Sequence, residues 1–178
     1  MAGPRHKPPL PEVPPRRAIV IDGANVIASS RRFPLERLDL ATAWAQAGWP
    51  QLPVTVFLDR STAVRCRPEV QDVLRARCVD VTPGRPRYVV CPRGEPADEH
   101  LLQFAQQHDG LVLSNDRYAD FDDLRQGIVL VQFALAGDRF VVQPQAVWFR
   151  PPNGAQWVDV ATLQSPSVRD DGDSRDSV

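Results

Sequence analysis

Carboxylate and amide side chains stand where two apolar runs of this sequence end. Asp22 closes the run Ala18–Asp22, with Asn25 three residues later, and Asp116 follows Leu111–Leu113. If the runs are buried strands of an open α/β sheet, their carboxyl ends mark the usual ligand position. Oxygen ligands of this kind suit a hard divalent cation, so the sequence predicts a site for Mg²⁺ or Mn²⁺.

A third acidic segment comes from a helical pattern that begins at Pro96. Asp98 and Glu99 fall in its first turn, and Asp120 follows Asp116 along the chain. Helix N-termini and strand carboxyl ends often share one edge of an α/β sheet, which would bring several carboxylates together. Neighbouring carboxylates repel and raise one another's pKa, and a bound cation would relieve that repulsion.

Each acid also has a simpler explanation when it is taken alone. Asp22 before Gly23 suits a turn, and Asp98 in a first turn favours the helix dipole without any metal. Asp116 and Asp120 are suited to capping a short helix. Only their joint occurrence favours a functional site.

The elements that would position these residues alternate between strand and helix. Short apolar or β-branched runs predict strands, and apolar residues at helical spacing predict helices. The predicted strands are Ala18–Asp22, Val54–Leu58, Val79–Val81, Tyr88–Cys91, Leu111–Leu113, Ile128–Ala134 and Arg139–Val142. The predicted helices are Leu35–Gly48, Pro68–Cys78, Pro96–His108 and Phe121–Gln126. This order predicts an α/β fold with a mainly parallel central sheet, helices on both faces and a C-terminal hairpin at one edge.

The two ends of the chain differ in composition from the part between them. Residues 1–16 are rich in proline, and residues 165–178 are acidic with little apolar content, so both are predicted to be disordered. Residues 17–164 are predicted to form one domain. The sequence has no apolar run of membrane-spanning length and three scattered cysteines, so we expect a cytoplasmic protein without a membrane partner.

Arginine is concentrated between residues 60 and 93, where eight arginines face three acids, although the whole chain has a net charge of -1. Such a segment suits contacts with an RNA phosphate backbone. The residues predicted to bind RNA are Arg60, Arg65 and Arg67, which follow the second strand, and then Arg85 and Arg87. The other interpretation is a solvated surface, and it is preferred for Arg75 and Arg77.

Three stretches of the sequence together resemble a known family. IVIDGANV, PADEHLLQFAQQHDGLVLSNDRYADF and IVLVQFALAGDRFVV are similar to the NYN branch of the PIN-like ribonucleases, in particular the Regnase-like group with its CCCH zinc finger. The resemblance runs from about Ala18 to about Gln143. It implies a Rossmann-like three-layer α/β/α PIN-like fold and Mg²⁺-dependent cleavage of single-stranded RNA. It also implies Asp22, Asp98 and Asp116 as the acids that bind the metal, with Asn25 and Asp120 in support.

The sequence departs from the Regnase-like pattern in two ways. Ala97 stands where that pattern has the first of two adjacent aspartates, and no zinc-finger spacing is present. Two functions therefore stay open, a metal-dependent endoribonuclease and a catalytically weak or inactive RNA-binding adaptor. PIN-like domains often pair, so a homodimer is a further expectation.

Overall fold

The structure is a computed structural model that describes residues 13–28, 34–136, 139–152 and 154–164. The predicted tail 165–178 and most of the predicted N-terminal arm lie outside these residues. The part of the arm that is described contacts the domain: Val13 packs against the core, and Arg16 Nη1 donates a hydrogen bond to the Gly127 carbonyl at 3.0 Å. None of the described helices is both long and apolar enough to cross a membrane.

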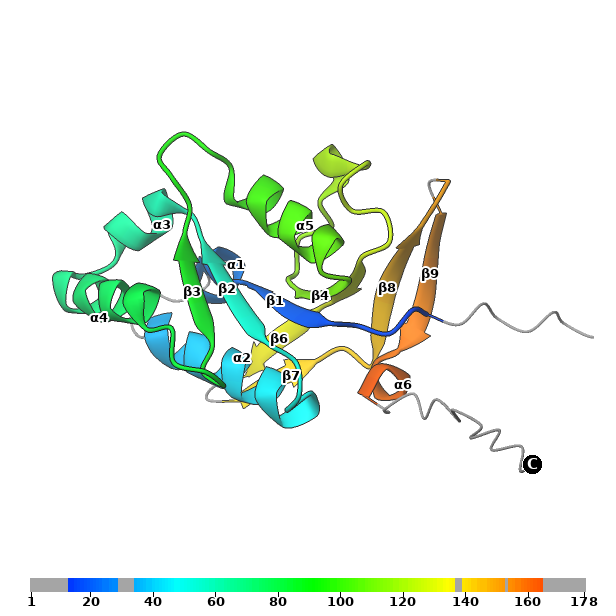
Figure 1. Cartoon of the computed structure of the whole chain (residues 1–178), viewed down its shortest axis with the longest axis horizontal. Helices are drawn as coiled ribbons and strands as arrows, with labels where there is room; N and C mark the ends of the chain where they lie inside the picture. The colour runs from blue at the N-terminus through cyan, green and yellow to red at the C-terminus, as the bar shows by residue number, and fades with distance from the viewer. Residues whose placement is uncertain (1–12, 29–33, 137–138, 153, 165–178) are drawn as a thin grey trace, which may run out of the picture.

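A seven-stranded sheet with the order β3-β2-β1-β4-β5-β8-β9 forms the centre of the molecule (Figure 1). The first five strands in this order are parallel to one another, and β8 and β9 are antiparallel. The strands are β1 (Ala18–Asp22), β2 (Val54–Leu58), β3 (Arg87–Val90), β4 (Gly110–Leu113), β5 (Val129–Val131), β8 (Gln145–Arg150) and β9 (Gly154–Asp159). Strands β1, β2, β4 and β5 are buried throughout, which explains their continuous apolar sequences.

Helices cover both faces of this sheet, as Figure 1 shows for α5 on one side and α2 on the other. Alternate residues of β1 serve the two faces: Ile19 and Ile21 join the core under α1 and α2, whereas Val20 joins the core under α5. The helices are α1 (Gly23–Ala28), α2 (Pro34–Gly48), α3 (Arg60–Arg65), α4 (Pro68–Val79), α5 (Ala97–Gln107) and α6 (Val160–Gln164), with a 3₁₀ helix η1 (Ala119–Phe121). The predicted α/β fold with a mainly parallel sheet is confirmed.

The C-terminal part of the sheet differs from the prediction. The predicted strand Ile128–Ala134 divides into β5 and β6 (Phe133–Ala136), and β6 pairs with β7 (Arg139–Val142) in a separate two-stranded sheet. Where the chain leaves the main sheet after β5, the Phe133 amide donates a hydrogen bond to Asn115 Oδ1 at 2.9 Å. The hairpin at the edge of the main sheet is β8–β9, which was not predicted.

Two smaller predictions are wrong. The β-branched run Val79–Val81 was predicted as a strand, but Val79 is the last residue of α4. Both valines are exposed, so neither is buried in a sheet. Asp80 instead accepts a hydrogen bond from the Thr82 amide, which forms a turn. The predicted helix Phe121–Gln126 is replaced by η1 and a turn.

Candidate active site

The strand order reverses between β1 and β4. From β1 the chain adds β2 and β3 on one side of the sheet, and then β4 and β5 on the other. This is the topological switch point at which open α/β sheets bind ligands. We call the ends of β1, β2 and β4, at Asp22, Leu58 and Leu113, the carboxyl edge of the sheet.

Asp22 lies at this switch point because the chain turns sharply into α1 directly after it. The turn requires Gly23: a Cβ on this residue would come within 2.8 Å of the Leu58 side chain and of the Phe57 carbonyl oxygen. Helix α1 therefore packs closely on β2 and holds its N-terminus beside Asp22. The Asp-Gly pair of the sequence thus reflects packing as well as turn formation.

The Asp22 carboxylate is buried, with 6% of the residue exposed, and three donors hold it. Its Oδ2 accepts hydrogen bonds from Ser114 Oγ at 2.8 Å and from the Tyr118 hydroxyl at 2.9 Å. Its Oδ1 accepts one from the Asn25 amide at 2.9 Å. A carboxylate offers about four lone-pair positions, so one on Oδ1 is left for a cation or a water.

The electrostatics of Asp22 are a balance in which burial is the largest effect. Burial raises the pKa of Asp22, the bonds from Asn25, Ser114 and Tyr118 lower it, and the charge of Asp116 raises it again. The net direction is upward, which marks a carboxylate whose charge is incompletely compensated by the protein. A cation would supply the missing compensation.

Asn25 links the ends of β1 and β4 across the switch point. While its amide bonds Asp22, its side-chain Oδ1 accepts a hydrogen bond from the Asn115 amide at 3.1 Å. Asn115 in turn binds the Phe133 amide, so the segment after β4 is held from both sides. Asn25, predicted as a supporting residue, thus contacts both Asp22 and the segment after β4.

Asp116 is exposed and is positioned by a tight turn after β4. Its amide donates to Ser114 Oγ at 3.1 Å, and its Oδ1 accepts from the Tyr118 amide at 2.8 Å. Tyr118 adopts a left-handed backbone with φ 51°, which directs its ring inward. The ring is buried (3% exposed), so Tyr118 packs in the core and does not present a face for stacking on a base.

Asp98 lies in the first turn of α5, as predicted, and is half-buried. Burial, followed by the charges of Asp22, Asp116 and Asp59, raises the pKa of Asp98 to about 6. The structure therefore brings the three predicted acids into one electrostatic group. Their mutual repulsion is the effect that the sequence led us to expect.

Asp59 is a fourth acid of this group that the sequence reasoning missed. Asp59 directly follows β2, whereas Asp22 is the last residue of β1, so a search for acids at strand ends would have found both. Asp59 also caps α3, where its carboxylate accepts bonds from the Ser61 hydroxyl and from the amide and hydroxyl of Thr62. Burial opposes ionisation of Asp59, but these bonds and the charge of Arg65 together lower its pKa.

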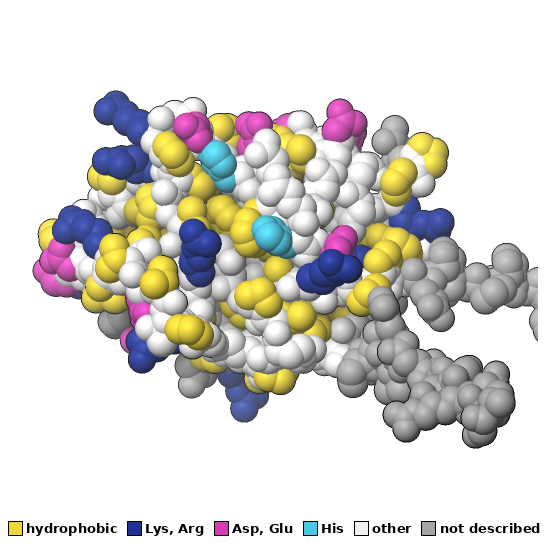
Figure 2. All heavy atoms as spheres, in the orientation of Figure 1, with side chains coloured by type: hydrophobic (Ala, Val, Ile, Leu, Met, Phe, Trp, Pro, Cys, Tyr) yellow, Lys and Arg dark blue, Asp and Glu magenta, His cyan; other side chains and the backbone are white. Residues whose placement is uncertain are grey.

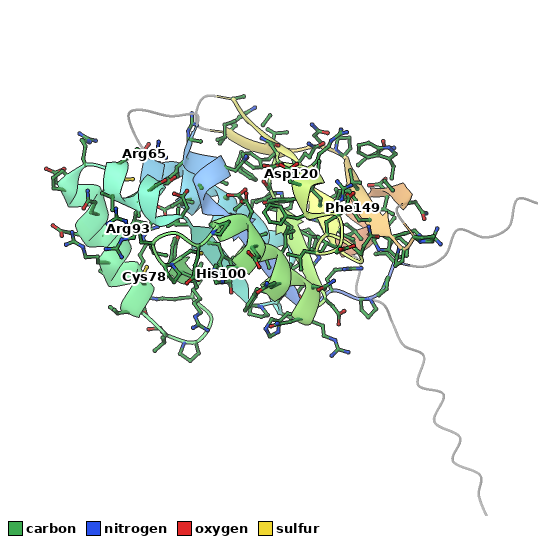
Figure 3. All side chains as sticks on the ribbon, turned by 90° about the horizontal axis from the view of Figure 1, so that it is seen from above. Arg65, Cys78, Arg93, His100, Asp120 and Phe149 are labelled. Atoms are coloured by element: carbon green, nitrogen blue, oxygen red, sulfur yellow. The ribbon has the colours of Figure 1, made fainter. Side chains whose placement is uncertain are left out.

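The predicted site residues do not all converge. Asp120 belongs to η1 and is exposed, and among the described residues it makes no hydrogen bond to the other acids. Figure 3 shows Asp120 on one side of α5, with Arg65 and Arg93 on the other.

The predicted RNA-binding arginines fall at opposite edges of the sheet. Arg60 and Arg65 are the first and last residues of α3, which follows the carboxyl end of β2, and Arg67 directly precedes α4. Arg85 and Arg87 lie at the amino end of β3, which is parallel to β2, so they are remote from the acids. Figure 2 shows acidic side chains along the rim over α5 and η1, and basic side chains toward α3 and α4.

Arg85 is also engaged elsewhere. It forms an ion pair of 3.0 Å with Asp80, whose pKa is lowered to about 2 by hydrogen bonds from Thr82 and then from Arg85. The arginines that remain suited to the substrate are those near α3.

The acids at the carboxyl edge fit a hydrated divalent cation such as Mg²⁺. Among the residues that the structure describes, no three Asp, Glu, His or Cys side chains approach closely enough to hold one ion between them. Mg²⁺ in proteins usually keeps several waters and binds through one or two carboxylates together with substrate phosphates. The lone pair left on Asp22 and the repulsion at Asp98 fit a hydrated ion of that kind.

A mainly parallel sheet with helices on both faces and acids at its switch point defines an open α/β domain. More particularly, the chain belongs to the family of Zc3h12a-like ribonuclease NYN domains, which matches residues 15–146. The match spans all of the acids described above.

Solved structures of other proteins are similar to this chain. Two structures of Arabidopsis thaliana nuclear protein-only RNase P 2 (PRORP2) are similar at 14% identity, with TM-scores of 0.51 and 0.50. Each covers 79% of this chain, which spans only 35% and 36% of the two PRORP2 chains. The PIN domain endonuclease Utp24 matches with a TM-score of 0.41 and 17% identity, over 74% of this chain and 95% of Utp24. At 14% identity, the likeness to PRORP2 supports the fold alone.

Proposed function

We propose that this chain is a divalent-metal-dependent endoribonuclease that cleaves single-stranded RNA at the carboxyl edge of the sheet. The observation that carries the proposal is the buried Asp22 carboxylate, held by three donors beside the electrostatically coupled Asp98. Carboxylates with perturbed pKa values cluster at functional sites, and open α/β sheets bind their ligands at the switch point. Membership of a ribonuclease family supports the same reaction class.

Asp22, Asp98 and Asp116 would hold Mg²⁺ or Mn²⁺, directly or through waters. When bound, such an ion lowers the pKa of a water and offsets the charge that develops on a phosphate. Asp22 supplies a fixed oxygen because its three hydrogen bonds leave it a single orientation. The rigidity of that oxygen is the contribution of β1 and of the residues after β4.

Burial and the charges of Asp22, Asp116 and Asp59 raise the pKa of Asp98 in the metal-free protein. A bound cation would relieve that repulsion and keep Asp98 ionised. Asn25 keeps the ends of β1 and β4 together, and Asp120 would bind a water at the margin of the site. Arg60, Arg65 and Arg67 would bind phosphates on either side of the scissile bond. The expected products carry a 5′-phosphate and a 3′-hydroxyl.

The test is cleavage of a circular single-stranded RNA with Mg²⁺, since only an endonuclease opens a circle. Wild type should linearise the circle, and Asp22→Asn should be at least about 100-fold slower, as is common when a charged group of an active site is lost. Asp72→Asn is the matched control, because Asp72 is an exposed acid that pairs with Arg75 on α4. Equal rates for wild type and Asp22→Asn would refute the assignment.

An RNA-binding adaptor is the second candidate, and Ala97 is the observation that favours it. A carboxylate lost from the first turn of α5 would weaken cation binding while leaving the arginines of α3 in place. Calorimetric titration with Mn²⁺ separates the two functions. Binding of RNA without binding of Mn²⁺ at millimolar concentration would favour the adaptor.

A further inference from the structure

A cavity of about 630 Å³ lies between α3 and the loop that joins β3 to α5. Asp59, Arg60, Ser61 and Val64 line one wall, and the loop residues from Pro92 to Pro96 line the other. Its volume is within the range of roughly 300–1,000 Å³ that is usual for small-ligand pockets. We call it the α3 cavity.

We propose that the α3 cavity binds a nucleotide of the RNA substrate next to the scissile phosphate. The inference rests on the proposed function and adds a subsite to it. It is supported by the charges of the cavity, by its apolar surface and by its position beside the acids.

Two arginines among the lining residues of the α3 cavity, Arg60 and Arg93, are suited to bind a phosphate. Among the described residues, Arg60 and Arg93 have no ion-pair partner, whereas Arg75, Arg77 and Arg85 are paired with Asp72, Asp39 and Asp80 respectively. The two acids of the cavity accept hydrogen bonds from other side chains of this chain and from one backbone amide, and neither pairs with Arg60 or Arg93. Asp59 accepts bonds from Ser61 and Thr62, and Glu95 contacts His100 Nε2 at 2.5 Å. Two arginines therefore remain for an anionic ligand.

The apolar surface of the α3 cavity favours a base. Val64 is 59% exposed on the inner wall, and Pro92 and Pro96 face the same space from the loop. A cavity that combines cationic and apolar walls matches a nucleotide, which has a charged phosphate and a flat, weakly polar base. A free inorganic anion would use only the arginines.

The position of the α3 cavity connects it to the proposed catalytic acids. Asp59 follows β2 by one residue, and the β2 residue Phe57 is in register with Asp22 on β1. On the other wall, Pro96 directly precedes α5, whose first turn carries Asp98. Figure 3 shows Arg93 on the side of α5 that faces α3. A strand of RNA cut at the acids would therefore pass the mouth of the cavity.

Two pairs of matched variants test the cavity by RNA binding. Arg93→Gln and Val64→Gln alter the cavity, and Arg75→Gln and Val73→Gln make the same exchanges on α4, where Val73 is 40% exposed. Each is combined with Asp22→Asn, and binding of a short fluorescent single-stranded oligoribonucleotide is followed by anisotropy. The oligonucleotide is also prepared with one abasic position at a time, to locate the base that enters the cavity.

Arg93→Gln should weaken binding about tenfold, as expected for one lost bond between charged groups, and Arg75→Gln should change it little. The Asp22→Asn protein should bind the oligonucleotide with one particular abasic position more weakly than the intact oligonucleotide. Adding Val64→Gln should remove this difference in affinity, whereas adding Val73→Gln should leave it. If both cavity variants behave like their controls, the subsite is refuted whether or not wild type cleaves RNA. If they differ from their controls but wild type cleaves no RNA, the subsite stands as a binding site and the nuclease proposal fails.

Discussion

The Tyr118 hydroxyl donates a 2.9 Å hydrogen bond to Asp22 Oδ2, and the two residues are 96 positions apart in the sequence. Burial and the nearby charge of Asp22 raise the pKa of Tyr118 well above its usual value, so the hydroxyl stays a donor over the whole working range of pH. This bond ties the turn after β4 to the end of β1. It fixes the orientation of the carboxylate on which the proposed chemistry depends.

Replacing Tyr118 by phenylalanine removes that donor while keeping the ring. Because the bond lowers the pKa of Asp22, its loss should raise that pKa and shift the acid limb of the pH–rate profile for RNA cleavage to higher pH. The free energy of unfolding near neutral pH should fall by about 1.5–3 kcal/mol, the usual range for a bond to a charged group. Stopped assays from pH 5 to 8 and urea unfolding measure the two effects.

Tyr88→Phe is the control for Tyr118→Phe. Tyr88 is also buried, and its hydroxyl accepts a bond from Arg77 at 2.9 Å, but it lies on β3 away from the acids. The Tyr88→Phe variant should have a lower free energy of unfolding but the same pH–rate profile as wild type. An identical profile for Tyr118→Phe and wild type would contradict a role for this bond in positioning Asp22.

Asp98 should make the stability of the metal-free protein fall as the pH rises. Its folded pKa of about 6 exceeds its usual value of 3.8, so its contribution is present below pH 4 and is lost as the pH rises through 6. Asp98→Asn should therefore have a higher Tm than wild type at pH 7.5 in EDTA, with the difference disappearing near pH 4. Mg²⁺ should raise the Tm of wild type at pH 7.5 and that of Asp98→Asn less.

Thermal scans of wild type, Asp98→Asn and the exposed-acid variant Asp72→Asn at several pH values make this comparison. The Asp72→Asn variant should follow wild type throughout. A Tm difference between Asp98→Asn and wild type that is constant from pH 4 to 8 would show that repulsion among the acids is not its cause.

Gly23→Ala should destabilise the protein through packing alone. The new methyl group would lie 2.8 Å from the backbone oxygen of Phe57, which cannot move without disturbing β2. Overpacking of this kind typically costs about 1–3 kcal/mol, to be measured by urea unfolding. At Gly154 a Cβ would have 3.7 Å to its nearest neighbour, so Gly154→Ala should be close to neutral. Equal stabilities of the two variants would contradict the close approach of α1 to β2.

The edge at which an arginine lies should decide its effect on RNA binding. Arg60→Gln, beside the acids, should weaken binding and reduce the slope of log K against log salt concentration by about one. Arg85→Gln, at the amino end of β3 and paired with Asp80, should leave that slope unchanged. Affinities measured between 50 and 200 mM salt, roughly the range over which phosphate contacts are resolved, test this. A larger effect for Arg85 would place the RNA across the opposite edge.

Much of the fold could be predicted because its strands are short, apolar and buried on both faces. The predicted bounds of β1, β2 and β7 agree with the structure. The prediction of a strand at Val79–Val81 was wrong because β-branched residues also occur at helix ends. Only pairing with a neighbouring strand decides whether such a run forms a strand. The β8–β9 hairpin was missed because four of the six residues of β9 are exposed, so the apolar pattern of this strand is weak.

The acids of the candidate site could be selected from the sequence, but the contacts that position them could not. Asp22, Asp98 and Asp116 could be found because chain order places strand ends and helix starts at one edge. The bonds of Ser114 and Tyr118 to Asp22 could not, since they depend on the left-handed turn at Tyr118. Arg85 and Arg87 were selected by composition, and composition does not tell which end of β3 they occupy.

We propose that the carboxyl edge of the sheet binds a hydrated divalent cation through one or two of the acids Asp22, Asp98 and Asp116. Anomalous diffraction from crystals of the protein soaked in Mn²⁺ tests it most directly. We expect a Mn²⁺ peak that contacts a carboxylate oxygen of Asp22, Asp98 or Asp116, with waters completing its coordination. Saturating Mn²⁺ that binds elsewhere on the chain and leaves this edge without a peak would contradict it.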